Sequence, residues 1–146
     1  MKPELIQACL DWWVARLNLI PELKDKVVLG FSVEDMMQQL SAATGARIGI
    51  VYEGIVPVQT PNKDSHVVSI SASIGVGLCL IADGKLPGQE RGVIPAVRIL
   101  DKIRKSGFDQ RSPTGHFWKM LAELPASEKN GVQVWLQRWS SPIQLS

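Results

Sequence analysis

The stretch that decides the fold runs from Val67 to Ala82 and reads VVSISASIGVGLCLIA. From Val68 onward every second residue is apolar, and the positions between are mostly serine or glycine. Successive side chains of a β-strand point to opposite faces of a sheet, so this alternation predicts a half-buried strand. At ~3.3 Å per residue the run would span roughly 50 Å, far more than an ordinary strand.

The two faces of this predicted strand differ in the size of their side chains. We expect the apolar face, from Val68 through Ile74 to Leu80, to lie in the core. The other face carries almost no side chain, since it consists of Ser69, Ser71, Ser73, Gly75 and Gly77. Small residues allow close approach by a helix, a neighbouring subunit or water, and the sequence leaves these three possibilities open.

The composition is that of an ordinary globular protein. The chain has 146 residues, 45% of them hydrophobic and 21% charged, which predicts a single domain over residues 1–146 with a sizeable core. The formal net charge of +2 is too small to indicate nucleic acid or a membrane as a partner.

The cysteine and histidine residues do not indicate a metal, cofactor or redox site. Cys9 and Cys79 both lie in apolar surroundings, so we expect small buried thiols rather than a disulfide. His66 and His116 have no ligand at the spacing of a zinc site. The N-terminal stretch does not resemble a signal peptide, and no segment resembles a membrane span. We therefore expect the protein to lie in a reducing cytoplasm.

The remaining elements follow from periodicity and turn residues. Helical spacing predicts a first helix between Pro3 and Pro21, a second from Ser32 to Gly45, and a third over Pro95–Ser106. We expect strands over Arg47–Glu53, His116–Leu124 and Val132–Trp139, with a long loop over Gly54–His66 and a turn over Ala126–Gly131 that ends in Asn-Gly. The order predicts an α+β fold, in which a mainly antiparallel twisted sheet packs helices on one face.

Two surfaces lack an explanation inside a monomer and are candidates for contacts with other subunits. One is the small-residue face of the long strand. The other is a glutamine and tryptophan face of the last strand, which consists of Gln133, Trp135, Gln137 and Trp139. Aromatic residues are enriched in interface cores, but a helix layer of the same chain is an equally good cover for either face.

The order of these segments resembles the tail-terminator (tail-completion) family of tailed bacteriophages, particularly the versions in Mu-like prophages. The resemblance lies in four segments: RIGIVYEG after two helices, SHVVSISASIGVGLCLIA, VRILDKIRKSGF, and the terminal FWKMLAELPASEKNGVQVWLQRWSSPI. They span most of the chain from Ala46 onward, and the resemblance rests on pattern and order rather than on a catalytic signature.

The resemblance implies a structural virion protein and not an enzyme, with no catalytic, cofactor or metal residues. Proteins of this family form a hexameric ring at the end of the tail tube, end its polymerisation and present a surface to the head–tail connector. The implied partners are therefore further copies of the chain, the tail-tube protein and the neck. The implied location is the virion tail, assembled in the cytoplasm of the host bacterium.

Three alternatives remain open from the residues alone. The nearest is another tail-tube or neck-connector protein. A second is a small cytoplasmic α+β enzyme with a site in the Gly54–His66 loop. A third is a nucleic-acid-binding module that uses the basic face of the third predicted helix, formed by Arg98, Lys102, Arg104 and Lys105.

Overall fold

The computed structural model describes residues 3–30, 32, 34–36, 45–57, 70–83, 93–129 and 131–145. Its helical elements are α1 (Pro3–Leu17), the short 3-10 helix η1 (Pro21–Leu23) and α3 (Ile94–Gly107). Its strands are β1 (Val27–Gly30), β2 (Arg47–Pro57), β3 (Ile70–Asp83), β4 (Lys119–Lys129) and β5 (Val132–Leu145).

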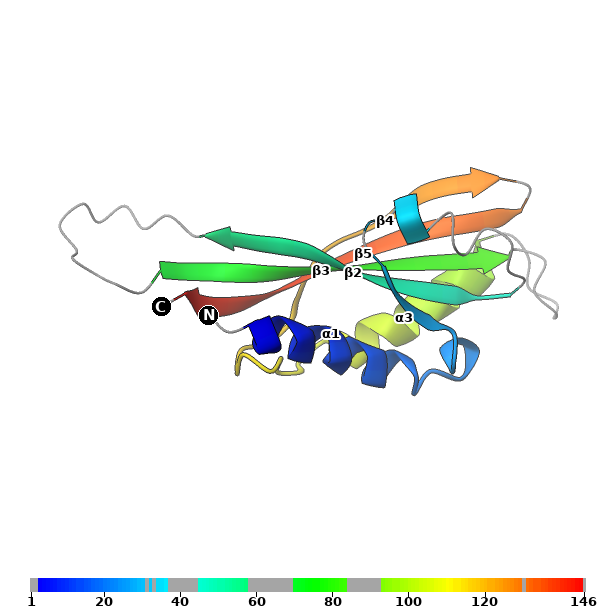
Figure 1. The fold of residues 1–146 in the computed structure, drawn as a ribbon. Coiled ribbons are helices and arrows are strands. Elements are labelled where there is room, and N and C mark those ends of the chain that lie inside the picture. Colours follow the sequence, from blue (N-terminus) through cyan, green and yellow to red (C-terminus); the bar gives the residue numbers. More distant parts are fainter. Residues whose placement is uncertain are drawn as a thin grey trace.

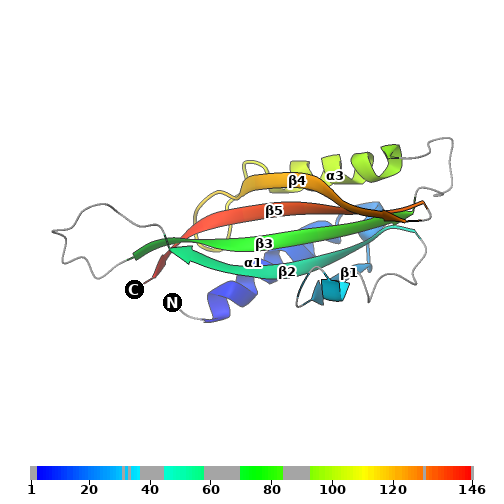
Figure 2. The ribbon, with the colours of Figure 1, turned by 90° about the horizontal axis from the view of Figure 1, so that it is seen from above.

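The strands form one open sheet in the order β1-β2-β3-β5-β4. β1 is parallel to β2, whereas the other neighbouring pairs are antiparallel. Helices α1 and α3 pack on the same face of the sheet, which we call the helix face (Figure 1). The sheet is long and twisted when seen from above (Figure 2). The predicted α+β fold, with a mainly antiparallel sheet and helices on one face, is therefore confirmed.

Strand β3 lies at the centre and turns its apolar side chains toward the helices, as predicted. Ile74, Val76, Leu78 and Leu80 are at most 1% exposed, and all four belong to the main core cluster with α1 and α3. All 14 residues of β3 pair with β5, from Ile70 opposite Leu145 to Asp83 opposite Val132. The central strand therefore fixes the register of both neighbours.

A cluster of tryptophans joins α1 to the sheet and to the end of α3. The ring of Trp13 lies 5.0 Å from Trp139 and 5.4 Å from Trp118, measured between centroids. Gly107 ends α3 against this cluster, since a Cβ added there would lie 2.6 Å from Trp139 and 2.7 Å from Trp13. Only a residue without a side chain lets the end of α3 approach the indole rings this closely.

A buried polar network lies between α3 and the sheet. The side-chain amide of Gln137 donates to the Leu100 carbonyl at 3.2 Å and to Glu123 at 2.8 Å, and its oxygen accepts from the Trp139 indole at 3.0 Å. Arg104 donates to both carboxylate oxygens of Glu123 at 2.6 Å. The network satisfies the polar atoms of Gln137, which is fully buried.

The opposite face of the sheet, which we call the outer face, has a smaller apolar cluster at one end. It consists of Met36, Val51, Cys79, Ile81 and Val134. Met36 follows Ser32, whose hydroxyl accepts a hydrogen bond from the Asp35 backbone N–H at 3.1 Å, which is the usual hydrogen bond of a helix N-cap. Residues 34–36 are helical, and most of the predicted second helix lies outside the described residues.

Several boundaries differ from the prediction. β1 was missed because four residues, VVLG, are too few to show a period. β2 continues through Gly54 to Pro57, so the start of the predicted loop is strand. β4 likewise continues to Lys129 and begins only at Lys119. β5 continues past Trp139 and through Pro142 to Leu145. Ser140 is the last residue of β5 that pairs with β4, so Pro142 interrupts no hydrogen bond between these two strands.

The apolar residues of α3 differ in their exposure to solvent. Val97 is 36% exposed, whereas Ala96, Ile99, Leu100 and Ile103 are buried.

The described helices include none that is both long and apolar enough to cross a membrane.

Replacing Ile74 by aspartate should abolish folding at 25 °C. Ile74 is fully buried under the helices, and an unpaired carboxylate there would cost several kcal/mol, about the whole stability of a domain of this size. Ser71→Asp is the matched control, since Ser71 lies on the outer face of the same strand and is exposed. Circular dichroism and urea unfolding should show a cooperative transition for Ser71→Asp only, and a stable Ile74→Asp variant would contradict the assigned core.

Candidate interaction surface

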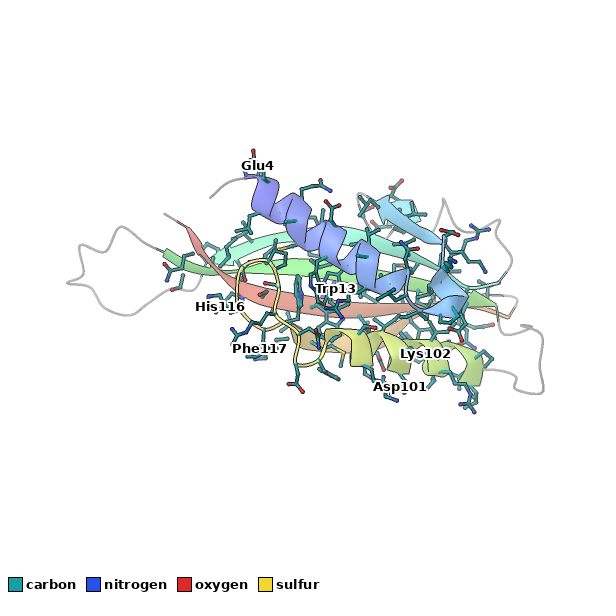
Figure 3. The ribbon with its side chains drawn as sticks, turned by 90° about the horizontal axis from the view of Figure 1, so that it is seen from below. Glu4, Trp13, Asp101, Lys102, His116 and Phe117 are labelled. Carbon is teal, nitrogen blue, oxygen red and sulfur yellow. The ribbon has the colours of Figure 1, made fainter. Side chains whose placement is uncertain are left out.

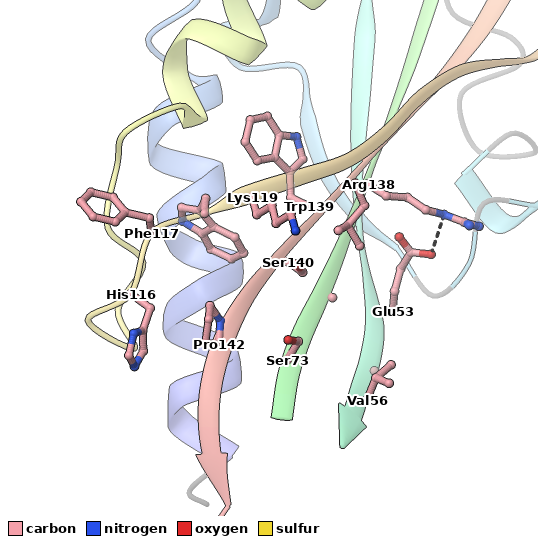
Figure 4. Close-up of a pocket in the computed structure, with 14 residues that line it drawn as sticks. Glu53, Val56, Ser73, His116, Phe117, Lys119, Arg138, Trp139, Ser140 and Pro142 are labelled. Atoms are coloured by element: carbon pink, nitrogen blue, oxygen red, sulfur yellow. Dashed lines mark ion pairs between the residues drawn. The ribbon is translucent and has the colours of Figure 1, made fainter. Parts of the chain in front are cut away.

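The centre of the outer face is crossed by an ion pair that spans three strands. Glu53 of β2 forms an ion pair with Arg138 of β5, with 3.3 Å between Nε and Oε2 (Figure 4). The side chain of Glu53 passes over β3, because a Cβ added at Gly77 would lie 2.8 Å from its Oε1 and one at Gly75 would lie 3.3 Å from its Cβ. The two glycines therefore leave the space that this side chain fills.

A β-bulge puts Glu53 in this position. Tyr52 pairs with Val76 and Gly54 pairs with Gly75, so Glu53 is an extra residue on β2. Gly54 has φ of 95°, a backbone conformation that favours glycine.

Beyond the ion pair, the outer face is hollowed into a groove of about 850 Å³. Its floor is the ends of β3 and β5, where Ser73 and Gly75 lie beside Ser140 and Pro142. Its margins carry exposed apolar side chains: Val56 is 67% exposed, Phe117 51% and Leu121 57%. Leu121 is the extra residue of a second bulge, in β4. Exposed apolar side chains gathered around one groove are typical of surfaces that contact other molecules.

The predicted contact residues on β3 have different environments. Ser71 is exposed, and Ser73 and Gly75 are half-buried in the groove. Gly77 is buried beneath Glu53, so its small size is explained within the subunit and we withdraw it from the predicted contact surface. Ser69 lies outside the described residues.

The predicted glutamine and tryptophan face of β5 lies on the helix face. Gln137 and Trp139 are fully buried under α3 and α1, where no partner of the folded subunit can reach them. We therefore correct their assignment from contact surface to core. Gln133 and Trp135 are half-buried and line a second, smaller hollow near the β4–β5 turn, so their role in a contact stays a prediction.

Sequence reasoning missed the residues that shape the groove. Glu53 and Arg138 are far apart in sequence and meet only because β2, β3 and β5 are neighbours. Leu121 was placed inside a regular alternation, and a bulge changes that alternation without a fixed motif. The glycine after Glu53 was the available signal, since an isolated glycine within a strand pattern often marks a bulge.

The basic face of α3, which was a candidate nucleic-acid site, is largely paired with carboxylates. Lys102 pairs with Glu22 of η1, and Lys105 pairs with Asp101 at 2.9 Å. Hydrogen bonds from Lys105 and then Arg104 hold the pKa of Asp101 below its usual value. Because these cations are matched by anions, the face offers little free charge for phosphate groups, which weakens the nucleic-acid alternative.

Both cysteines are buried free thiols, as predicted. Cys9 lies in the main core and Cys79 in the outer-face cluster, and neither is exposed. Burial raises the pKa of each thiol to about 11. No group of three or more metal-binding side chains occurs in the part of the chain that the structure describes.

A scan against protein-family models finds no match for this chain. A search of curated proteins likewise finds none. Its function is therefore argued from the geometry above together with the resemblance in segment order.

Gly77→Val should destabilise the fold by about 1–3 kcal/mol because the new side chain displaces Glu53. In a Glu53→Ala background the same change should be nearly neutral, since valine suits a strand once the space is empty. Urea unfolding of the four proteins measures the coupling, which we expect at about 0.5–3 kcal/mol. An equal effect of Gly77→Val in both backgrounds would contradict the crossing side chain.

Neither thiol of the native protein should react with Ellman's reagent within minutes at pH 8. A pKa of about 11 leaves almost no thiolate at that pH, and burial blocks access. Both thiols should react once the chain is unfolded in urea, which serves as the control. Rapid labelling of one thiol in the folded protein would place Cys9 or Cys79 at an accessible surface.

Proposed function

We propose that this chain is a structural virion protein that forms a ring at the end of a phage tail tube. In this role it ends tube polymerisation and presents the surface to which the head or neck is joined. Its location would be the tail of the virion, and its partners would be other copies of the chain, the tube protein and the connector. The role is structural rather than catalytic.

The main support for the proposal is that helices cover one face of the sheet, whereas part of the other face is open. Helices α1 and α3 seal one face around a large apolar core. The outer face instead ends in a groove with exposed apolar margins. A subunit that is stable by itself and keeps an apolar surface open is suited to assembly with other proteins. The twisted sheet with helices on one side also agrees with the fold that the family resemblance implies.

Another tube or neck protein is the nearest alternative, because it would need similar surfaces. The enzyme alternative placed its site in the Gly54–His66 segment, of which residues 54–57 belong to β2 and the rest lies outside the described residues. No specific contact in the described part of the chain favours that reading over assembly.

The purified protein should form a closed ring at micromolar concentration. Native mass spectrometry and sedimentation velocity should give one dominant species near six times the 16.1 kDa subunit mass. A cyclic assembly has a defined end point, so the mass should not increase further with concentration. A protein that remains monomeric up to about 1 mM, a range in which even weak specific contacts are populated, would contradict the proposed ring.

The length of the phage tails distinguishes a tail terminator from a neck connector. In a phage or prophage that encodes this chain, deletion of its gene should give tails of uncontrolled length in electron micrographs, and the wild-type gene should restore a uniform length. Tails of normal length that fail to join heads would support the neck-connector alternative instead.

A further inference from the structure

The segment of residues 108–118 between α3 and β4 is a tightly held loop, which we call the Phe117 loop. Ser112 N–H donates to the His116 carbonyl at 2.7 Å, and Arg111 and Phe117 form an isolated β-bridge. The hydroxyls of Ser112 and Ser141 lie 2.7 Å apart and join the loop to β5. Such bonding fixes the loop before any partner binds, which reduces the entropy cost of an interaction.

This rigid loop presents an aromatic side chain together with positive charge. Phe117 is 51% exposed and is directed away from β5 at the margin of the groove (Figure 4). The guanidinium of Arg111 lies 4.4 Å from the centroid of its ring and holds it in place. Lys119 is also exposed and lines the same groove. Aromatic anchors on rigid supports are typical centres of protein–protein contacts.

A hollow of about 440 Å³ lies near the turn between β4 and β5, and we call it the hairpin hollow. Its apolar and aromatic lining residues are Val93, Pro125, Ala126 and Trp135, and its polar ones are Ser127, Gln133 and the carboxylate Glu128. Val93 is 41% exposed, and Ala126 is the extra residue of a bulge that turns this part of β4 outward. The carboxylate of Glu128 accepts from the Gly131 backbone N–H at 3.0 Å, so it is held at the turn.

The two features lie at opposite ends of α3. The Phe117 loop follows the C-terminal end of this helix (Figure 3), whereas the hairpin hollow includes Val93, the residue before its first turn. They therefore do not meet within one subunit. A cyclic ring needs two different and complementary surfaces on each subunit, because its contacts run head to tail.

We propose that the Phe117 loop of one copy inserts into the hairpin hollow of the next copy. Phe117 packs against Trp135 and Pro125, and the cations Arg111 and Lys119 face Glu128 across the contact. The inference rests on the proposed ring and deepens it by naming the two surfaces that meet. Opposite charge at the two ends favours this register over a contact between like ends.

Two variants test the contact from its two sides. Phe117→Asp removes the anchor and places a carboxylate opposite Glu128, whereas Ala126→Arg fills the hollow and repels Arg111. Each variant should sediment as a monomer at concentrations where the wild type forms the ring. Both positions are exposed, so circular dichroism and urea unfolding should be unchanged. If either variant unfolds, Phe117→Ser and Val93→Lys replace the pair, since a lysine at position 93 would repel Arg111 and Lys119.

Mixing the two variants gives a more specific test of the contact. The Phe117→Asp chain keeps an intact hollow and the Ala126→Arg chain keeps an intact loop, so an equimolar mixture should form a dimer and nothing larger. Leu19→Asp and Ala15→Arg are matched controls, since they make the same changes at exposed positions of α1 and of the turn that follows it. Both controls should form the wild-type ring.

The outcomes separate this inference from the proposed function. If either variant still forms the ring, or if the mixture stays monomeric, the head-to-tail contact is wrong. The proposed ring would remain, and the two surfaces would face another partner. A wild-type protein that never assembles would overturn both.

Discussion

The two faces of β3 carry side chains of different size, and the rest of the structure depends on that difference. On the helix face, Ile74, Val76, Leu78 and Leu80 provide an unbroken apolar surface against which α1 and α3 pack. On the outer face, Gly75 and Gly77 leave space over the strand. The first face makes the subunit stable by itself, and the second leaves room for side chains from the neighbouring strands.

The space over the glycines is used within the subunit. Glu53 reaches across β3 toward Arg138, so that the middle of the outer face is occupied by an ion pair rather than by a partner. An exposed pair of this kind contributes at most about 1 kcal/mol. Its main consequence is geometric, because it divides the outer face into an apolar cluster at one end and an open groove at the other.

The fold was largely predictable from the sequence, because long elements repeat their pattern many times. The alternation of β3 and the apolar spacing of α1 identified the core face correctly, and the Asn-Gly turn identified the last hairpin. β1 was not predictable because four residues show no period and its pairing with β2 depends on tertiary structure.

The candidate surface was less predictable than the fold. A stripe of small residues is compatible with a partner, a helix or a side chain from the next strand, and only the structure distinguishes Gly77, which lies under Glu53, from Ser73, which lines the groove. The face of Gln137 and Trp139 was a candidate contact because aromatic residues are enriched in interface cores. Its partners, Leu100 and Glu123, come from α3 and β4 and leave no trace near it in the sequence.

The proposed ring would need no change in the core, because helices α1 and α3 already cover one face of the sheet within the single subunit. The proposed contact would involve exposed residues of the Phe117 loop and the hairpin hollow, and both surfaces are held by hydrogen bonds within the single subunit. Phe117 is exposed and lies outside the core clusters, so changes at this residue would affect the proposed contact more than the fold, whereas Trp135 of the hollow also packs against the main core.

Disulfide trapping tests most directly whether the ends of neighbouring subunits meet. The test introduces one cysteine at His116, in the loop before β4, and one at Ala126, in the hairpin hollow of the same chain, and the native Cys9 and Cys79 are buried and should not interfere. Mild oxidation should give a ladder of covalent multimers on a denaturing gel that stops at six chains. A gel that shows only monomers, although the protein assembles before oxidation, would contradict the head-to-tail account.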